Sequence, residues 1–213
     1  MCSAYGWASF IACPLESLFT EINLLTESVP ISILLVAVII KCLLLPLYIK
    51  SKKESQKLAR LAPKLKELRI KYQKEPQRML LAQQQIYQKE NVSPIKGACL
   101  QLLSIPPIYG AYLVFNESSI LNVTESFLWL QSLSLPDPFY LLPFLLGTVL
   151  ISIQLLFPTI PLERSQSIIV IIMAAASTLF MSQIASGLAL FYCGMAMCQL
   201  LFDCLWKLVS QIL

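Results

Sequence analysis

The chain has 213 residues, of which 57% are hydrophobic and 13% are charged, and its net charge is +4. Soluble domains carry about 25% charged residues, so this composition excludes an ordinary soluble protein and indicates an integral membrane protein. Because the sequence contains no histidine, the commonest general base and metal ligand are missing. We therefore expect no enzymatic activity, no metal and no cofactor.

Residues 1–28 precede the first apolar run and are predicted to form an amphipathic helix. Glu16 lies on its polar face, and the opposite face consists of apolar residues at helical spacing: Leu15, Leu18, Phe19, Ile22 and Leu25. The segment lacks the basic start of a signal peptide, so we do not expect it to be cleaved off as one. We expect its helix to lie in the outer membrane interface. The alternative is an extracytoplasmic lead-in without a function.

Five apolar runs are long enough to cross a membrane as helices. They are predicted at 29–49, 95–115, 138–157, 166–184 and 186–206. The segments that connect or follow them are 50–94, 116–137, 158–165 and 207–213. The sequence thus predicts an all-α membrane protein with five transmembrane helices.

The basic residues are concentrated on one side of these spans. Of the 16 Lys and Arg residues, 13 lie between Lys50 and Lys96, whereas 1–28 and 116–137 contain none. By the positive-inside rule, the N-terminus lies outside and the C-terminus lies in the cytoplasm.

Residues 50–94 are therefore expected to form a basic helical hairpin in the cytoplasm. Its first helix has leucines at spacings of three and four residues, and Lys74-Glu75-Pro76 separates it from a second helix. Pro63 is expected to start or kink the first helix. The hairpin either only sets the topology or provides a docking surface for headgroups, ribosomal RNA or another protein. Its few aromatic residues argue against DNA as a partner.

Lys41 is a cation inside the first predicted span. Placing a cation there costs roughly 2.5–3.5 kcal/mol on insertion scales, so such residues usually mark functional sites. At about 1.5 Å per helical residue, the Lys41 backbone lies roughly 13 Å inside the boundary at Lys50. We expect no carboxylate at the same depth. The Lys41 side chain can extend only part of the way to the interface, so its unpaired charge must be hydrated. We therefore infer a hydrophilic cavity within the membrane.

Polar residues in the other spans are candidates to line this cavity. They are Gln101 and Ser104 in the second span, Gln154 in the third, and Tyr192, Gln199 and Asp203 in the fifth. Gln101 and Ser104 share a helix face, and the three residues of the fifth span follow one stripe. Each residue alone could instead join helices by a hydrogen bond worth about 0.6 kcal/mol.

The seven cysteines form no CxxC motif and no zinc-like spacing. We expect them to be small apolar fillers rather than disulfides or metal ligands.

Several motifs along nearly the whole chain resemble one family. They are Lys41-Cys42-Leu43-Leu44-Leu45-Pro46-Leu47, Ala62-Pro63-Lys64, Lys89-Glu90-Asn91-Val92-Ser93-Pro94, the segment Trp129 to Pro143, and Ser186-Gly187-Leu188-Ala189-Leu190-Phe191-Tyr192. The chain resembles the YidC/Oxa/Alb family of membrane protein insertases, in its short bacterial form.

The resemblance implies a groove that is open to the cytoplasm and to lipid but closed outside. In that family the groove inserts client transmembrane segments and helps them to fold, without nucleotide hydrolysis. The implied partners are nascent membrane proteins, the ribosome and the Sec translocon at the cytoplasmic face, and phospholipids. The implied location is the bacterial plasma membrane, with an organelle inner or thylakoid membrane as the alternative.

The sequence departs from the family pattern at several groove positions. Lys41 stands where the family usually has Arg, and Ser104 stands where it often has Gln. Two alternatives to an insertase therefore stay open: an accessory assembly factor with the same fold but no insertase activity, and a small transporter.

Overall fold

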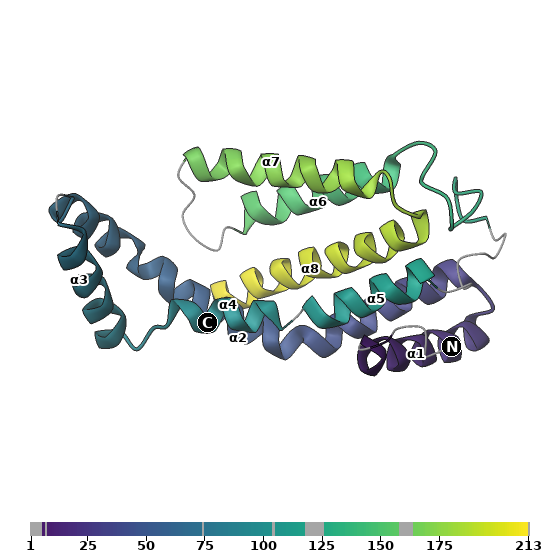
Figure 1. Cartoon of the computed structure of the whole chain (residues 1–213), viewed down its shortest axis with the longest axis horizontal. Helices are drawn as coiled ribbons and strands as arrows, with labels where there is room; N and C mark the ends of the chain where they lie inside the picture. The colour runs from purple at the N-terminus through teal and green to yellow at the C-terminus, as the bar shows by residue number, and fades with distance from the viewer. Residues whose placement is uncertain are drawn as a thin grey trace. The chain divides into compact units, whose positions relative to one another are not determined.

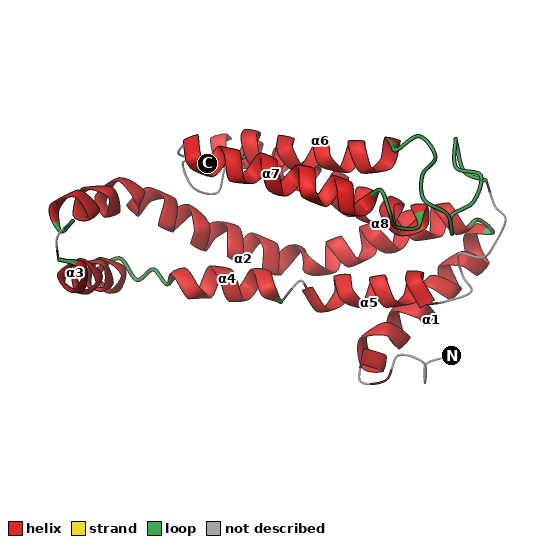
Figure 2. Cartoon of the chain, turned by 45° about the horizontal axis from the view of Figure 1, so that its top comes forward, coloured by secondary structure: helices red, strands yellow, loops and turns green. Residues whose placement is uncertain are grey.

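The computed structural model describes residues 6, 8–73, 75–103, 105–117, 126–157 and 164–212. Among these residues the regular elements are helices, and the only strand-like pairing is an isolated bridge between Phe127 and Leu130 (Figure 2). The all-α prediction is confirmed. The helices are α1 (Ser9–Thr26), α2 (Val29–Lys71), α3 (Pro76–Lys89), α4 (Pro94–Leu102), α5 (Ile105–Glu117), α6 (Leu141–Leu156), α7 (Arg164–Met181) and α8 (Ser186–Ile212).

The chain forms two compact units. The first, called here the bundle unit, comprises Met1–Leu43, Ile105–Phe157 and Arg164–Leu213. The second, the hairpin unit, comprises Leu44–Ser104 and Pro158–Glu163. Helix α2 contributes residues to both units, because it continues from Val29 to Lys71 without interruption. Pro63 lies inside this helix and does not start one.

In the bundle unit, α8 lies between α6 and α5 (Figure 1). Helix α7 packs on α6, and α1 packs on α5. Three aromatic rings connect these layers: Phe19 of α1 contacts Phe115 of α5 at 5.6 Å between ring centroids, and Phe115 contacts Phe191 of α8 at 5.4 Å. All three side chains are buried. Their burial contributes to holding the outer helix against the bundle, since aromatic side chains remove large apolar areas from solvent.

The packed face of α1 differs from its prediction at two residues. Leu15, Phe19 and Ile22 are buried as expected, but Glu16 is also buried and Leu25 is 85% exposed. Ala12 is completely buried and was not counted in the predicted face. At about 100° per residue, Ala12 shifts the centre of the packed face toward Glu16 and away from Leu25.

The apolar run 95–115, predicted as one span, contains two helices, α4 and α5. Helix α4 ends at Leu102 and α5 begins at Ile105. Pro106 and Pro107 follow at once, and neither has the backbone N–H that a continuing helix would need. Prolines are tolerated in a first helical turn, so their position accounts for a new helix beginning here.

In the hairpin unit, α2 ends at Lys71 and α3 begins at Pro76, on either side of the break predicted at 74–76. Two contacts connect the elements of this unit. Lys64 Nζ lies 2.9 Å from Glu90 Oε1, and Ser51 Oγ donates a hydrogen bond of 3.3 Å to the Gly97 carbonyl. Most of the basic side chains are exposed, so their charge is available to solvent or to a partner.

Helices α6 and α7 approach each other closely at Gly147. A Cβ atom built on Gly147 would meet the Thr178 hydroxyl, with Thr178 Cβ at 3.5 Å. The hydroxyl is itself held by a hydrogen bond of 2.9 Å to the Ala174 carbonyl. Small residues at such positions let membrane helices pack backbone to backbone.

We expect Gly147→Ala to destabilise the protein by about 1–3 kcal/mol, the usual cost of overpacking a well-packed interface. Chemical denaturation in detergent micelles measures the effect. Adding Thr178→Ala should recover part of the loss, because it removes the atoms that clash. Thr148→Ala, on the exposed face of α6, is the matched control and should change stability little. Equal stability of Gly147→Ala and the wild type would show that the helices can separate at no cost.

Candidate functional site

The first half of α2 packs against α8 at Gly194. A Cβ atom on Gly194 would lie 3.1 Å from Leu34 Cδ2 and 3.3 Å from Ala37 Cβ, so glycine permits this approach. One turn further along both helices, Lys41 of α2 lies near Cys198 of α8. The two helices therefore run side by side in the same direction, and this brings Lys41 to the middle of α8.

Lys41 has an acidic neighbour. Its side chain is half-buried, and its ammonium group lies close enough to the Asp203 carboxylate for an electrostatic interaction. Asp203 is therefore within electrostatic range of Lys41, while the expectation that no carboxylate lies at the same depth in the membrane stays a prediction. Lys41 and Asp203 are far apart in the sequence, and only the packing of α2 on α8 reveals that they are neighbours.

Asp203 is almost fully buried, with 1% of its surface exposed. Gln199, one turn earlier on α8, donates a hydrogen bond of 3.0 Å from Nε2 to Asp203 Oδ2. A buried carboxylate needs such donors, since removing it from water without compensation is costly. Lys41, Gln199 and Asp203 thus form one polar cluster, called here the Lys41 cluster. Chemically it can hold or exchange an acidic group, because it presents a cation beside a carboxylate and an amide.

The other predicted site residues lie elsewhere. Tyr192 of α8 is half-buried and lies two turns before the Lys41 cluster along α8. Gln154 is exposed near the end of α6. Gln101 belongs to α4 in the hairpin unit, and Ser104 lies outside the described residues. The structure therefore brings three of the seven predicted site residues together. That the other four line the same cavity stays a prediction.

The segment before α6 forms a second polar centre that sequence reasoning did not assign. Asp137 is buried and its carboxylate accepts three hydrogen bonds: from Trp129 Nε1 at 3.0 Å, from the Phe139 backbone N–H at 3.0 Å and from the Leu142 backbone N–H at 2.7 Å. By accepting from Leu142, the carboxylate satisfies a backbone N–H in the first turn of α6 that has no partner within the helix. The segment Trp129 to Pro143, which carries the family resemblance, was the available signal for this centre. Its residue spacing did not show that Asp137 is the common acceptor.

The same segment is attached to the start of α8. The backbone N–H groups of Ser186 and Gly187 donate to the carbonyls of Leu135 and Leu133, at 2.8 and 2.9 Å. The Ser186 hydroxyl donates to the Ser132 carbonyl at 2.9 Å. Together with the Asp137 network, these bonds fix the polypeptide across one end of the bundle unit.

One cysteine differs from its expected role. Cys13 of α1 forms a disulfide bond, so the expectation that the cysteines are only apolar fillers is wrong at this position. Cys42, Cys99, Cys193, Cys198 and Cys204 are free. The spacing of the cysteines along the chain contains no signal for this bond.

Comparison with known proteins decides the family. A family model described as "60Kd inner membrane protein" matches residues 21–208, which include the Lys41 cluster and the Asp137 network. The chain belongs to this family.

Two curated relatives are named "Membrane protein insertase YidC". The protein from Actinobacillus succinogenes is 36% identical over 189 residues, and that from Pasteurella multocida is 34% identical over 188 residues. Each alignment covers 88% of this chain but only 35% of the relative, so the chain spans about a third of the relatives' length. The family and these relatives support a location in a bacterial inner membrane.

A solved structure confirms the fold. It is titled "Active YidC insertase crystal structure with the first transmembrane domain resolved". It superimposes with a TM-score of 0.72 at 22% sequence identity, covering 92% of this chain and 46% of that chain.

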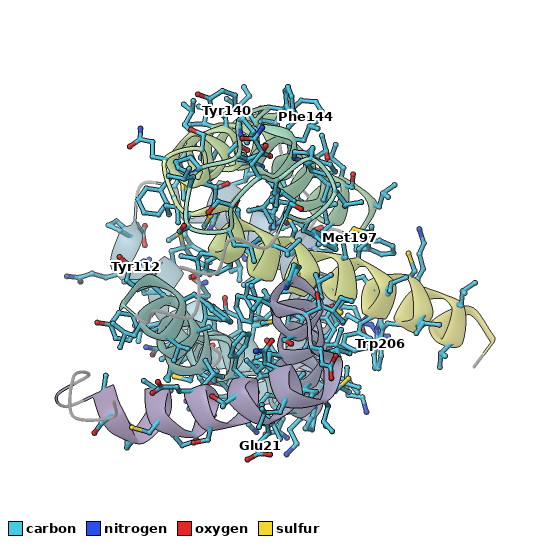
Figure 3. The ribbon with its side chains drawn as sticks, turned by 90° about the vertical axis from the view of Figure 1, so that its right-hand side faces the viewer. Glu21, Tyr112, Tyr140, Phe144, Met197 and Trp206 are labelled. Carbon is cyan, nitrogen blue, oxygen red and sulfur yellow. The ribbon has the colours of Figure 1, made fainter. Side chains whose placement is uncertain are left out.

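The surface of the bundle unit suits an inner membrane protein. Within the described part of the chain, two helices, Val29–Lys71 and Ser186–Val209, are long and apolar enough to cross a membrane, and shorter apolar helices occur at Ile105–Phe115, Leu141–Leu156 and Ile171–Met181. Tyr140 and Phe144, 59% and 67% exposed, project outward at the start of α6 (Figure 3). Aromatic side chains in such positions are typical of the membrane–water interface.

Proposed function

We propose that this chain inserts transmembrane segments of nascent membrane proteins into the inner membrane and helps them to fold. Insertion uses a polar groove open to the cytoplasm and requires no nucleotide hydrolysis. The observation that carries the proposal is the Lys41 cluster, a half-buried cation and amide beside a buried carboxylate in an apolar bundle, in a chain whose relatives are named insertases.

The Lys41 cluster suggests how a client is captured. An acidic or polar residue of the client approaches Lys41 and replaces Asp203 as its electrostatic partner. The client's apolar segment then moves into lipid, and the hydrophobic effect drives this transfer. Water around the cluster shortens the hydrocarbon path that the polar tail must cross.

The proposal includes five transmembrane helices with the N-terminus outside and the C-terminus in the cytoplasm. The charge distribution supports this orientation, because 13 of 16 basic residues lie between Lys50 and Lys96. The disulfide at Cys13 supports it independently, since disulfides persist in oxidising compartments such as the periplasm. The basic hairpin unit then faces the cytoplasm, where the ribosome and the Sec translocon are its proposed partners.

A second candidate is an accessory assembly factor without insertase activity. The proximity of Asp203 to Lys41 favours it, because the carboxylate reduces the net charge that a client would meet. Rescue of bacterial cells depleted of their own insertase separates the two functions. Growth and correct insertion of a reporter protein support an insertase, whereas expression in the membrane without rescue supports the accessory factor. Solute flux through purified protein in liposomes would instead indicate a transporter.

A further inference from the structure

The hairpin unit contains a polar pocket of about 550 Å³, a size typical of small-ligand sites. It lies where the last turns of α3, the connection to α4 and the first turn of α4 meet α2. The side chains that matter here are Glu54 of α2, Gln84, Tyr87 and Gln88 of α3, Asn91 of the connection and Lys96 of α4. The geometry points to this pocket as a binding site for the headgroup of phosphatidylethanolamine, an inference that rests on the proposed membrane placement.

The position of the pocket matches the headgroup region of the cytoplasmic leaflet. Glu54 follows Lys50, where the apolar part of α2 ends, by one helical turn, or about 6 Å. Helix α4 exposes apolar side chains beside the pocket: Ile95 and Leu102 are 71% and 58% exposed. Headgroup layers add about 5–8 Å to each side of the hydrocarbon core, so a group at this depth meets lipid headgroups.

The charges in the pocket select a zwitterion. Glu54 and Lys96 both line it and carry opposite charges, so the lining is close to neutral. A phosphate needs hydrogen-bond donors, which the Lys96 ammonium and the side-chain amides supply. A primary ammonium needs acceptors, which Glu54 and the amide oxygens supply. A purely anionic headgroup could use the Lys96 ammonium but would bring no cation to the Glu54 carboxylate, whose partner in the structure is Lys57 at 2.9 Å.

The same lining disfavours a choline headgroup. A quaternary ammonium has no N–H to donate and is usually bound by a cage of several aromatic rings. Among the described residues that line this pocket, Tyr87 is the one aromatic side chain. Its hydroxyl accepts a hydrogen bond of 2.8 Å from Gln83 and therefore keeps its own proton for donation to a phosphate oxygen.

The test is native mass spectrometry of the purified full chain with dioctanoyl phosphatidylethanolamine, phosphatidylcholine and phosphatidylglycerol at equal concentrations. We expect at least fivefold more bound phosphatidylethanolamine than either other lipid. Glu54→Gln and Lys96→Gln should each abolish this preference. Lys57→Gln is the matched control: it breaks the 2.9 Å ion pair between Lys57 and Glu54 but leaves the pocket carboxylate in place, and the preference should persist.

Equal retention of the three lipids, or an unchanged preference in Glu54→Gln, would overturn the assignment. Free phosphoethanolamine that competes as well as the lipid would also overturn it, because the site would then serve a soluble ligand. A glycine–serine decapeptide that displaces the lipid at lower concentration would show a peptide site instead. Insertion assays on the same protein keep the two proposals separate: lipid preference with no insertase activity would reject the proposed function and retain the lipid site.

Discussion

Lys41→Ala should slow the insertion of client segments with acidic tails by about 10- to 100-fold. An interaction with a charged group contributes about 1.5–3 kcal/mol, and each 1.4 kcal/mol corresponds to about a factor of ten. The substitution removes the cation of the Lys41 cluster but leaves Gln199 and Asp203, so an acidic tail meets only a carboxylate. Insertion into proteoliposomes, followed by protease protection of the translocated tail, measures the rate.

Three controls make this experiment specific. Lys41→Arg should preserve insertion, because it retains the charge. Lys50→Ala removes an exposed cation nine residues further along the same helix and should have little effect. Asp203→Asn should accelerate the insertion of acidic tails, since it removes the carboxylate that competes for Lys41. Wild-type rates for Lys41→Ala would reject the proposed capture step.

Asp137→Ala should destabilise the folded protein by about 3–5 kcal/mol. The buried carboxylate accepts three hydrogen bonds, and its removal leaves the Trp129 indole N–H and two backbone N–H groups without their acceptor. Each unsatisfied buried donor costs about 1–3 kcal/mol, and water entering the gap offsets part of the sum. Denaturation in detergent micelles, monitored by tryptophan fluorescence, reports both the stability and the environment of Trp129.

Asp137→Asn tests whether the network needs a carboxylate or only a side chain of the same shape. The amide oxygen can still accept from Trp129 and Phe139, but the amide NH2 then faces the Leu142 N–H, a donor against a donor. We expect a loss smaller than that of Asp137→Ala. Trp129→Phe should cost about 1–2 kcal/mol by removing one bond to a charged group. If Asp137→Ala and the wild type unfold at the same denaturant concentration, the network does not hold the start of α6.

Composition and periodicity were sufficient to predict that this is a membrane protein and that it is built from helices. The high apolar content and the spacing of leucines depend only on neighbouring residues, which is why the all-α fold could be predicted. Lys41 could be chosen for the same local reason, because a cation inside an apolar run is costly wherever that run packs. The proline pair at Pro106 and Pro107 was also a local signal for the break between α4 and α5, but the continuous apolar run concealed it.

Contacts between distant segments could not be predicted from the sequence. Lys41 and Asp203 are neighbours because Gly194 lets α2 approach α8. Asp137 makes its hydrogen bonds because the preceding loop folds back over α6. Periodicity shows which residues share a helix face, but it does not say which other helix that face meets. Amino-acid sequence alone therefore indicated a helical membrane protein with an unusual cation inside an apolar run. Tertiary structure alone decided that this cation has an acidic neighbour, because packing between helices sets the distance between charges that lie far apart along the chain.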